Sequence, residues 1–335
     1  MMNFKNGTLL LKMSKQFMPA RLLSLLCAAF MVGQVHAQSY PKKPIKMVIP
    51  YAAGQGTDIV GRYVADELSR ALKQAVVIDN RPGAGGNIGT QLTAKSAPDG
   101  YTVMIGTNAT HAANAFLFSQ PGFDAQADFE PIAMVGILPL VYVTAPANPV
   151  NTIQDLIAAA RSKPDALNTA VSTTTCRMAH ELFKMRGGAV MMPIDFKGSA
   201  QSITAVLGGH VDYMVDTIAS LQAQVASGQL KALGVTSISS SRLLPGVKSI
   251  SEQGVAGYEL VGWTVIFAPK GIPAEAAQTL ASSINKTLER ADVQAKLLQL
   301  GVDPQMKSGA ELKSFIASEK EKWGKLIGAA GLKPA

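Results

Sequence analysis

The sequence has 335 residues, of which 47% are apolar and 16% are charged, and its formal net charge at pH 7 is +8. This composition is ordinary for a globular protein with a sizeable core, and the length is typical of two domains. Only 6% of the residues are aromatic, so a binding site built from stacked rings, for sugars or for nucleic acid, has little to draw on.

The first 37 residues have the composition of a secretory signal peptide. They carry basic residues and no acidic one, and then an apolar run over 22–35 that is too short to span a membrane comfortably. The segment ends in Val35-His36-Ala37, a small-residue cleavage pattern, so we predict cleavage after Ala37 and export to the periplasm. Met13 and Met18 are alternative starts of translation.

Removal of this segment lowers the net charge to +4, which takes away the main support for nucleic-acid binding. Of the two cysteines, Cys27 lies in the segment, where the bulky Leu26 before it argues against lipid attachment. Cys176 remains alone, so the exported chain has no internal disulfide and depends on core burial for its stability.

Residues 46–72 are predicted to form a short strand, a loop of small residues and a helix. Thr57 is the predicted N-cap, and Asp58 in the first turn suits the positive end of the helix. Backbone N–H groups at such a helix start are unpaired and can bind an anion without a basic side chain. The turn therefore predicts a site for a small carboxylate. One apolar stripe recurs every four residues along the helix: Val60, Val64, Leu68 and Leu72.

Strand and helix signals alternate along the rest of the chain, as expected of α/β domains with mostly parallel sheets. The order predicts a first, discontinuous α/β domain at 38–140 and 260–335 and a second α/β domain at 141–259. Two chain crossings then make a hinge beside a cleft, the arrangement of a clamshell binding protein. Further strands are predicted at 75–78, 101–105, 138–144, 168–171, 191–194, 211–215, 230–235 and 259–268, and helices at 89–96, 153–162, 274–290, 292–300 and 309–330, after Cys176 and after Ser199.

Catalytic and cofactor sites are poorly supported. A dinucleotide site at Gly83, Gly85 and Gly89 is disfavoured, because the spacing is G-x-G-x-x-x-G and Pro82 breaks the preceding strand. No two of the histidines after residue 37 have the spacing of metal ligands. A helix start and a neighbouring arginine could lower the pKa of the Cys176 thiol, but no histidine and base accompany it. An exported enzyme is therefore the least favoured class, and no cofactor is expected.

Five polar loops follow predicted strands, at 52–58, 106–111, 172–177, 195–199 and 216–217. Such loops are commonly polar and solvated, so polarity alone does not make a site. Three of them lead directly into helix N-termini, and they come from both predicted domains, which favours a ligand site in the cleft. The candidate ligand-binding residues are Ala53, Gly54, Gln55, Thr57, Asp58, Thr107, Thr110, Thr173, Thr174, Thr175, Arg177, Phe196, Lys197, Gly198 and Asp216.

A series of short motifs, spread in order over nearly the whole mature chain, resembles one known family. The motifs are Tyr40-Pro41-Lys42-Lys43-Pro44-Ile45, Ile49-Pro50-Tyr51-Ala52-Ala53-Gly54 with Thr57-Asp58, Asn80-Arg81-Pro82-Gly83-Ala84-Gly85-Gly86, Pro98-Asp99-Gly100-Tyr101-Thr102, Phe196-Lys197-Gly198-Ser199, and Gly262-Trp263 followed by Ala268-Pro269. By these motifs the sequence resembles the substrate-binding proteins of tripartite tricarboxylate transporters, also called the Bug family.

The resemblance implies a periplasmic solute-binding protein of the type II-like clamshell fold, without catalysis, that serves a carrier with a large and a small membrane subunit. It also implies a ligand carboxylate held between the domains by backbone amides, hydroxyls and bridging waters. Two departures concern that site. The first loop has Gly54-Gln55 where the family usually has Gly-Gly, and Thr173 to Arg177 replace a Gly- and Ser-rich loop. Arg177 could add a bidentate charged contact.

The predicted function is therefore capture of a small carboxylate in the interdomain cleft and its delivery to the two membrane subunits of the carrier. The ligand is expected to be a dicarboxylate, an aromatic acid or an acidic amino acid, and Asp216 could select an ammonium or a hydroxyl group. We expect a monomer that binds no nucleic acid and no metal. A sensing role, as partner of a periplasmic signalling receptor, is the alternative that the sequence leaves open.

Overall fold

The structure is a computed structural model that describes residues 40–163 and 166–334. The predicted signal peptide, residues 1–37, lies outside the described residues. No helix within the described ranges is long and apolar enough to cross a membrane. By their contacts, the residues from Tyr40 onward group together as one unit, so the predicted boundaries at 140/141 and 259/260 stay a prediction.

One group of strands forms the sheet of the first lobe, the part of the molecule that carries the N-terminal strands. Its parallel strands are β1 (Ile45–Ile49), β2 (Val76–Asn80) and β3 (Thr102–Thr107). The long strands β4 (Phe129–Thr144) and β9 (Val261–Pro269) complete it in antiparallel pairing, with the short β10 (Asp303–Pro304) along β4. The order β2-β1-β3-β9-β4 places the two long strands at the edge that leads to the second lobe.

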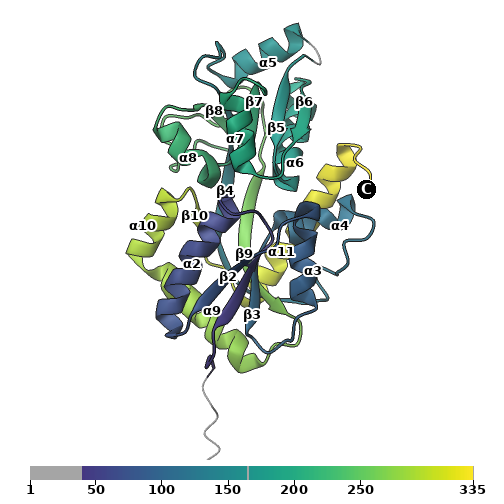
Figure 1. The fold of residues 1–335 in the computed structure, drawn as a ribbon. Helices are drawn as coiled ribbons and strands as arrows, with labels where there is room; N and C mark the ends of the chain where they lie inside the picture. Colours follow the sequence, from purple (N-terminus) through teal and green to yellow (C-terminus); the bar gives the residue numbers. More distant parts are fainter. Residues whose placement is uncertain (1–39, 164–165, 335) are drawn as a thin grey trace, which may run out of the picture. The chain divides into compact units, whose positions relative to one another are not determined.

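The second lobe is built on the far half of β4. Residues Leu140 to Thr144 pair antiparallel with β7 (Tyr213–Thr217) and β8 (Lys231–Val235). Beyond β7 lie β5 (Asn168–Val171) and β6 (Met192–Asp195), both in parallel pairing. Strand β4 therefore runs through both sheets, as Figure 1 shows. The two-domain α/β fold is confirmed, whereas the prediction of mostly parallel sheets is wrong for the pairs that involve β4 and β9.

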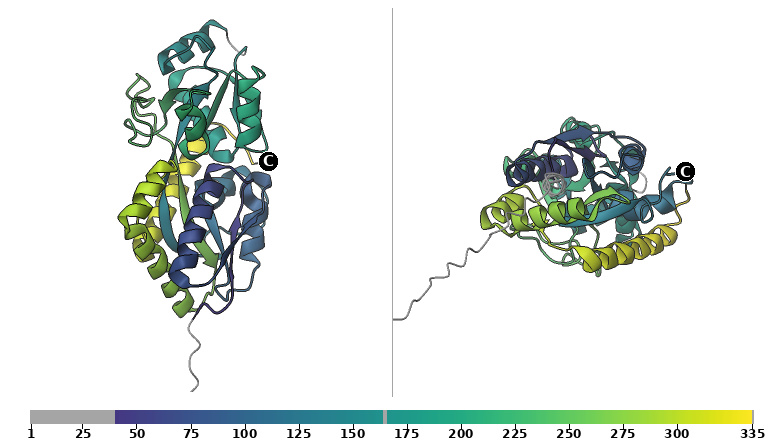
Figure 2. Two further views of the ribbon diagram at one scale, coloured as in Figure 1. Left: turned by 60° about the vertical axis from the view of Figure 1, so that its left-hand side comes forward. Right: turned by 90° about the horizontal axis from the view of Figure 1, so that it is seen from below.

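Helices cover both sheets (Figure 1). In the first lobe, α2 packs against α9, and Figure 2 shows these two helices side by side. The helices and helical turns of the first lobe are α2 (Gly56–Leu72), η1 (Ala84–Gly86), α3 (Asn87–Ala94), η2 (Ala109–Ala113), α4 (Asn114–Leu117), α9 (Ala274–Glu289), α10 (Ala291–Gln299) and α11 (Gly309–Ala329). Those of the second lobe are α5 (Ile153–Ser162), α6 (Thr174–Gly187), α7 (Ser199–Leu207) and α8 (Ile218–Ala226).

The apolar stripe of α2 is buried as its periodicity predicts. Val60, Val64 and Leu68 are buried and pack in one core cluster with the side chains of β1, whereas Leu72 is only partly buried at the end of the helix. Burial of a side chain of this size contributes about 1.5–3 kcal/mol, so the stripe fixes the start of α2 relative to the sheet.

Two local predictions are corrected by the structure. The N-cap of α2 is Gln55, in an extended conformation, and not Thr57, because the helix already begins at Gly56. Helix α8 was not predicted at all, although its N-cap, Thr217, lines the site described below.

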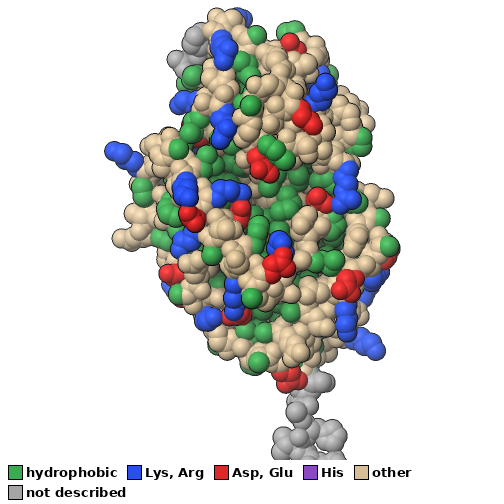
Figure 3. Space-filling view, turned by 180° about the vertical axis from the view of Figure 1, so that it is seen from behind, with side chains coloured by type: hydrophobic (Ala, Val, Ile, Leu, Met, Phe, Trp, Pro, Cys, Tyr) green, Lys and Arg blue, Asp and Glu red, His purple; other side chains and the backbone are tan. Residues whose placement is uncertain are grey.

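On the face opposite to that of Figure 1, basic and acidic side chains are interspersed among apolar ones (Figure 3). This face therefore presents both signs of charge rather than one large field of a single sign.

Candidate functional site

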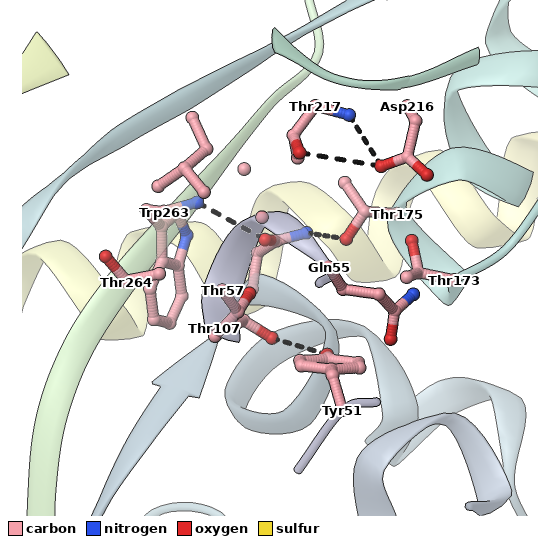
Figure 4. A pocket seen from close by; sticks show the side chains of 14 residues that line it. Tyr51, Gln55, Thr57, Thr107, Thr173, Thr175, Asp216, Thr217, Trp263 and Thr264 are labelled. Carbon is pink, nitrogen blue, oxygen red and sulfur yellow. Dashed lines mark hydrogen bonds between the residues drawn. The ribbon is translucent and has the colours of Figure 1, made fainter. Parts of the chain in front are cut away.

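A small cavity lies where the sheet passes from the first lobe to the second. The strand register explains the position of this cavity. Thr107 of β3 pairs with Thr264 of β9, and Gly262 of β9 pairs with Leu138 of β4. Two residues further along β4, Leu140 pairs with Thr217 of β7. The inner cavity, as we call it, has a volume of about 30 Å³. That is space for roughly two water-sized groups, or for the two oxygens of a carboxylate. It is lined by Tyr51, Gln55, Gly56, Thr57, Thr107, Asn108, Leu138, Thr173, Thr175, Asp216, Thr217, Gly262, Trp263 and Thr264 (Figure 4).

Three helices begin at the inner cavity. Gln55, Thr173 and Thr217 are the N-caps of α2, α6 and α8, and all three line the cavity. Thr173 and Thr217 cap their own helices through their hydroxyls, whereas Gln55 makes no side-chain cap bond. The first backbone N–H groups of α2 are therefore left without a capping side chain. None of the lining residues is basic and one, Asp216, is acidic, so the groups at the cavity that favour an anion are backbone N–H groups and the N-terminal ends of helix dipoles.

Gln55 contributes an unpaired donor to the cavity. Its Oε1 accepts a hydrogen bond from the backbone N–H of Ala52 at 3.0 Å, which orients the amide. Its Nε2 is buried and has no hydrogen-bond acceptor among the described residues, and the whole side chain is only 5% exposed. A buried donor without an acceptor is unfavourable by about 1–3 kcal/mol, and a ligand oxygen would relieve that penalty. Thr264 places a second buried hydroxyl in the same lining, and it too has no hydrogen-bond partner in the part of the chain that the structure describes.

The two lobes touch directly around the cavity. Asn108 of the first lobe donates from Nδ2 to Thr175 Oγ1 of the second at 2.8 Å, and Thr174 donates from its hydroxyl to Asn114 Oδ1 at 3.2 Å. Gly56, the first residue of α2, lies so close to Thr217 that the structure has no room there for a Cβ. These contacts describe a closed arrangement of the two lobes at the site.

Asp216 organises the second-lobe wall. Its Oδ2 accepts hydrogen bonds from Ser172 Oγ at 2.7 Å and Ser199 Oγ at 2.8 Å, and its Oδ1 accepts one from the Thr217 N–H at 2.7 Å. Burial raises the pKa of this carboxyl group, and the hydrogen bonds oppose that shift. Both oxygens are already occupied, so Asp216 ties three loops together and has little capacity left to bind an ammonium group.

Asp58 has a similar task in the first lobe. It accepts from the Gly54 N–H at 2.9 Å, from Arg62 Nε at 3.0 Å and from Asn80 Nδ2 at 2.7 Å. The carboxylate fixes the 52–55 turn from behind, and the structure does not bring it into the inner cavity.

A larger, open compartment of about 490 Å³ lies against the inner cavity, and we call it the outer compartment. Tyr51, Gln55 and Thr173 line both spaces. Its other walls are mostly apolar, with Lys197 as the cation: Pro50, Ala52, Pro82, Gly83, Ala84, Gly85, Gly86, Ser172, Phe196 and Lys197.

The structure thus brings some of the predicted site residues together and separates others. Six of them line the inner cavity: Gln55, Thr57, Thr107, Thr173, Thr175 and Asp216. Phe196 and Lys197 line the outer compartment. Arg177 and Thr174 line a further pocket, where Arg177 Nη2 pairs with Asp195 Oδ2 at 2.6 Å. Ala53, Gly54, Asp58, Thr110 and Gly198 line none of these three spaces.

Several lining residues were not among the predicted ones. Trp263 donates its backbone N–H to Asn108 Oδ1 at 3.3 Å, and its indole N–H goes to the buried Glu319 of α11 at 2.9 Å. Tyr51 donates to or accepts from Thr107 Oγ1 at 2.8 Å. Tyr51 and Trp263 stand in the motifs that carry the family resemblance, and those motifs are the signal that could have found them.

The buried titratable groups do not form a catalytic set. Burial raises the pKa of the Cys176 thiol to about 12, and the thiol accepts a hydrogen bond from Thr173 Oγ1 at 3.0 Å. Burial lowers the pKa of His111 to about 3 and that of His180 to about 4. In the ranges that the structure describes, no three His, Cys, Asp or Glu residues are grouped so as to hold a metal ion.

Comparison with known proteins points to one family. The family described as "Tripartite tricarboxylate transporter family receptor" matches residues 60–332. Protein BugT of Bordetella pertussis is 32% identical over 311 residues, which cover 92% of this chain and 95% of BugT. The structure of R. palustris Rpa4515 with adipate is 31% identical with a TM-score of 0.86, over 89% of this chain and 100% of that one. MatC from Rhodopseudomonas palustris with bound malate is 26% identical with a TM-score of 0.78, over 86% and 100%.

Proposed function

This chain belongs to the tripartite tricarboxylate transporter receptor family, and we propose that it captures a small carboxylate in the inner cavity and delivers it to a membrane carrier. The carrier would have a large and a small membrane subunit, and delivery would take place in the periplasm, where the predicted signal peptide directs the chain. The protein is a solute-binding protein of this family, and we propose that it acts as a monomer and without catalysis.

The observation that supports the proposal is a cavity at which three helices begin and which has no basic side chain in its lining. Helices α2, α6 and α8 all begin at a cavity that has no basic lining residue, and the amide nitrogen of Gln55 is buried there without an acceptor. Helix N-termini favour an anion, and the volume of about 30 Å³ suits its head group. The ligands in the structures of Rpa4515 and MatC, adipate and malate, are both dicarboxylates, which supports a carboxylate here.

Titration calorimetry on the mature chain tests the proposal. The panel consists of the unbranched dicarboxylates from succinate to pimelate, malate, benzoate and acidic amino acids, with uncharged diols of similar length as controls. We expect heat of binding and a raised melting temperature with at least one carboxylate and none with the diols. Absence of binding across all the carboxylates would refute the proposed function.

A further inference from the structure

Gln55 stands between two spaces of different character. The inner cavity holds about 30 Å³, and the outer compartment holds about 490 Å³ and is open. Among the described residues, Tyr51, Gln55 and Thr173 line both of them, so these three side chains stand between the two spaces, and we call them the neck. Figure 4 shows Gln55 lying between Tyr51 and Thr173.

Each side chain of the neck is held in place by a hydrogen bond of its own. The hydroxyls of Tyr51 and Thr107 lie 2.8 Å apart. Gln55 Oε1 accepts from the Ala52 N–H at 3.0 Å, and Thr173 Oγ1 accepts from the Cys176 N–H at 3.1 Å. A neck of three fixed side chains does not widen without breaking one of these bonds, so its shape selects among ligands.

The free end of Gln55 has a second role. Oε1 is engaged by the Ala52 N–H, and Nε2 is buried without an acceptor among the described residues in a side chain that lines both spaces. A ligand carboxylate in the inner cavity would supply that acceptor, and a hydrogen bond to a charged partner is stronger than one between neutral groups. A neutral amide also adds no charge that would compete with the helix N-termini for the anion.

We infer that Gln55 determines the ligand specificity of the site: its Nε2 donates to the bound carboxylate, and its side chain, with Tyr51 and Thr173, admits only a carboxylate that is carried on an unbranched carbon. This inference rests on the proposed function. The ligand class is a linear carboxylate whose head group fills the inner cavity and whose chain extends into the outer compartment. The mostly apolar walls there suit methylene groups, and the exposed Lys197 lies in the same compartment for a second carboxylate.

Two families of ligand test the inference by calorimetry. Unbranched dicarboxylates from succinate to pimelate carry both carboxylates on methylene carbons. In trans-1,4-cyclohexanedicarboxylate and terephthalate, both carboxylates are attached to ring carbons. We expect the wild-type protein to bind its best linear ligand at least about tenfold more tightly than either ring compound, a ratio equivalent to about 1.4 kcal/mol.

Two substitutions distinguish the role of Gln55 as a hydrogen-bond donor from its role in the shape of the neck. In Gln55→Ala both roles are lost, so the affinity for the linear ligand falls about tenfold and the preference over the ring compounds shrinks. In Gln55→Glu the side chain keeps its size and its bond to Ala52, but a negative charge meets the bound carboxylate. Affinity then falls for every ligand while the preference for linear ones remains. Gln201→Ala, at an exposed position of α7, is the matched control and leaves binding unchanged.

The outcomes distinguish the inference from the proposed function. Equal binding of linear and ring ligands to the wild type, or wild-type selectivity in Gln55→Ala, overturns the inference while the proposed function stands. If the wild type binds no carboxylate, both the inference and the proposed function are refuted. A melting temperature is measured for each variant, and if Gln55→Ala is unfolded, the selectivity and affinity of Gln55→Glu decide the question.

Discussion

The contact between Gly56 and Thr217 predicts that one added methyl group opposes closure. In Gly56→Ala the new Cβ overlaps Thr217 Oγ1 and lies 3.2 Å from Thr217 Cβ and 3.3 Å from Ser220 Oγ. Thr217 cannot simply turn away, because its hydroxyl is 2.9 Å from Ser220 Oγ and caps α8. The two helix starts must therefore move apart. Forced overpacking of this kind is unfavourable by about 1–3 kcal/mol.

This overpacking energy raises the free energy of the closed form and so weakens ligand binding, whereas it does not act on the open folded protein. Gly56 is the first residue of α2 and its φ lies outside the left-handed region, so alanine fits the backbone there and the open protein does not lose stability. If the ligand requires the closed arrangement, its dissociation constant rises about 5- to 150-fold. Calorimetry with the best carboxylate of the panel measures this change, and thermal unfolding without ligand shows that α2 is intact.

Two further variants sharpen the experiment. Gly328→Ala places the same methyl group on α11, where nothing lies within 4 Å, and is expected to bind normally. Thr217→Ala removes the overlapping oxygen, so the double variant with Gly56→Ala should regain affinity beyond the sum of the single effects. Wild-type affinity in Gly56→Ala alone would refute the idea that this contact belongs to the ligand-binding state.

Three other predictions follow from the same contacts. Asn108→Ala removes the hydrogen bond to Thr175, and ligand affinity should fall about 2- to 13-fold in calorimetry, since such a bond contributes about 0.5–1.5 kcal/mol. Arg177→Ala should change affinity less than about threefold, because its guanidinium is ion-paired outside the inner cavity; a larger loss would place it at the ligand. Burial lowers the pKa of His111 to about 3 in the folded protein. Below pH 6.5 this histidine therefore binds a proton in the unfolded chain but stays neutral in the folded one. The contribution of His111 to the free energy of unfolding should therefore fall by about 2 kcal/mol between pH 7.5 and pH 5, in addition to a fall from His180, whose pKa burial also lowers. The total fall should weaken in His111→Phe but not in His210→Gln.

Much of the fold could be predicted because local signals and tertiary structure agree. Helix α5 and strand β5 have the predicted bounds, Ile153–Ser162 and Asn168–Val171. Thr152 and Asp155 form a capping box that marks the start of α5, and the apolar side chains of the helix repeat on one face. Such elements need no knowledge of what they pack against.

Other elements depend on distant partners. Strand β4 begins at Phe129, well before the predicted start at 138, and it carries Pro131, Gly136 and Pro139, which argue against a strand in local terms. Its pairing with β9 has register shifts near Pro131 and Gly136, so irregularities in the ladder accommodate these residues. Helix α8 is short and only weakly amphipathic, and its position is set by β7 and by contact with α2.

Part of the lining of the inner cavity could be predicted from the sequence. Strand-end loops that lead into helices predicted an anion site, and Gln55, Thr173 and Thr175 of those loops line the inner cavity. Asn108 and Thr264 join them only because β3 pairs with β9, and these two strands lie more than a hundred residues apart in the sequence. Likewise, Asp216 is a candidate ligand-binding residue in the sequence, whereas in the structure its Oδ2 accepts from hydroxyls of two other loops and its Oδ1 accepts from the Thr217 N–H.

Closure of the two lobes and binding of the ligand are expected to be coupled in this molecule. Gly56 at the start of α2 and Thr217 at the start of α8 belong to different lobes, and closure brings these two positive helix ends together. An anion between them turns an unfavourable approach into a favourable one, and it also satisfies the amide of Gln55. A ligand shifts a conformational equilibrium only by its difference in affinity for the two states. If the ligand is a carboxylate held between the lobes, as we propose, that difference is large because neither lobe alone presents the complete site. The carboxylate would then both require the closed form and stabilise it.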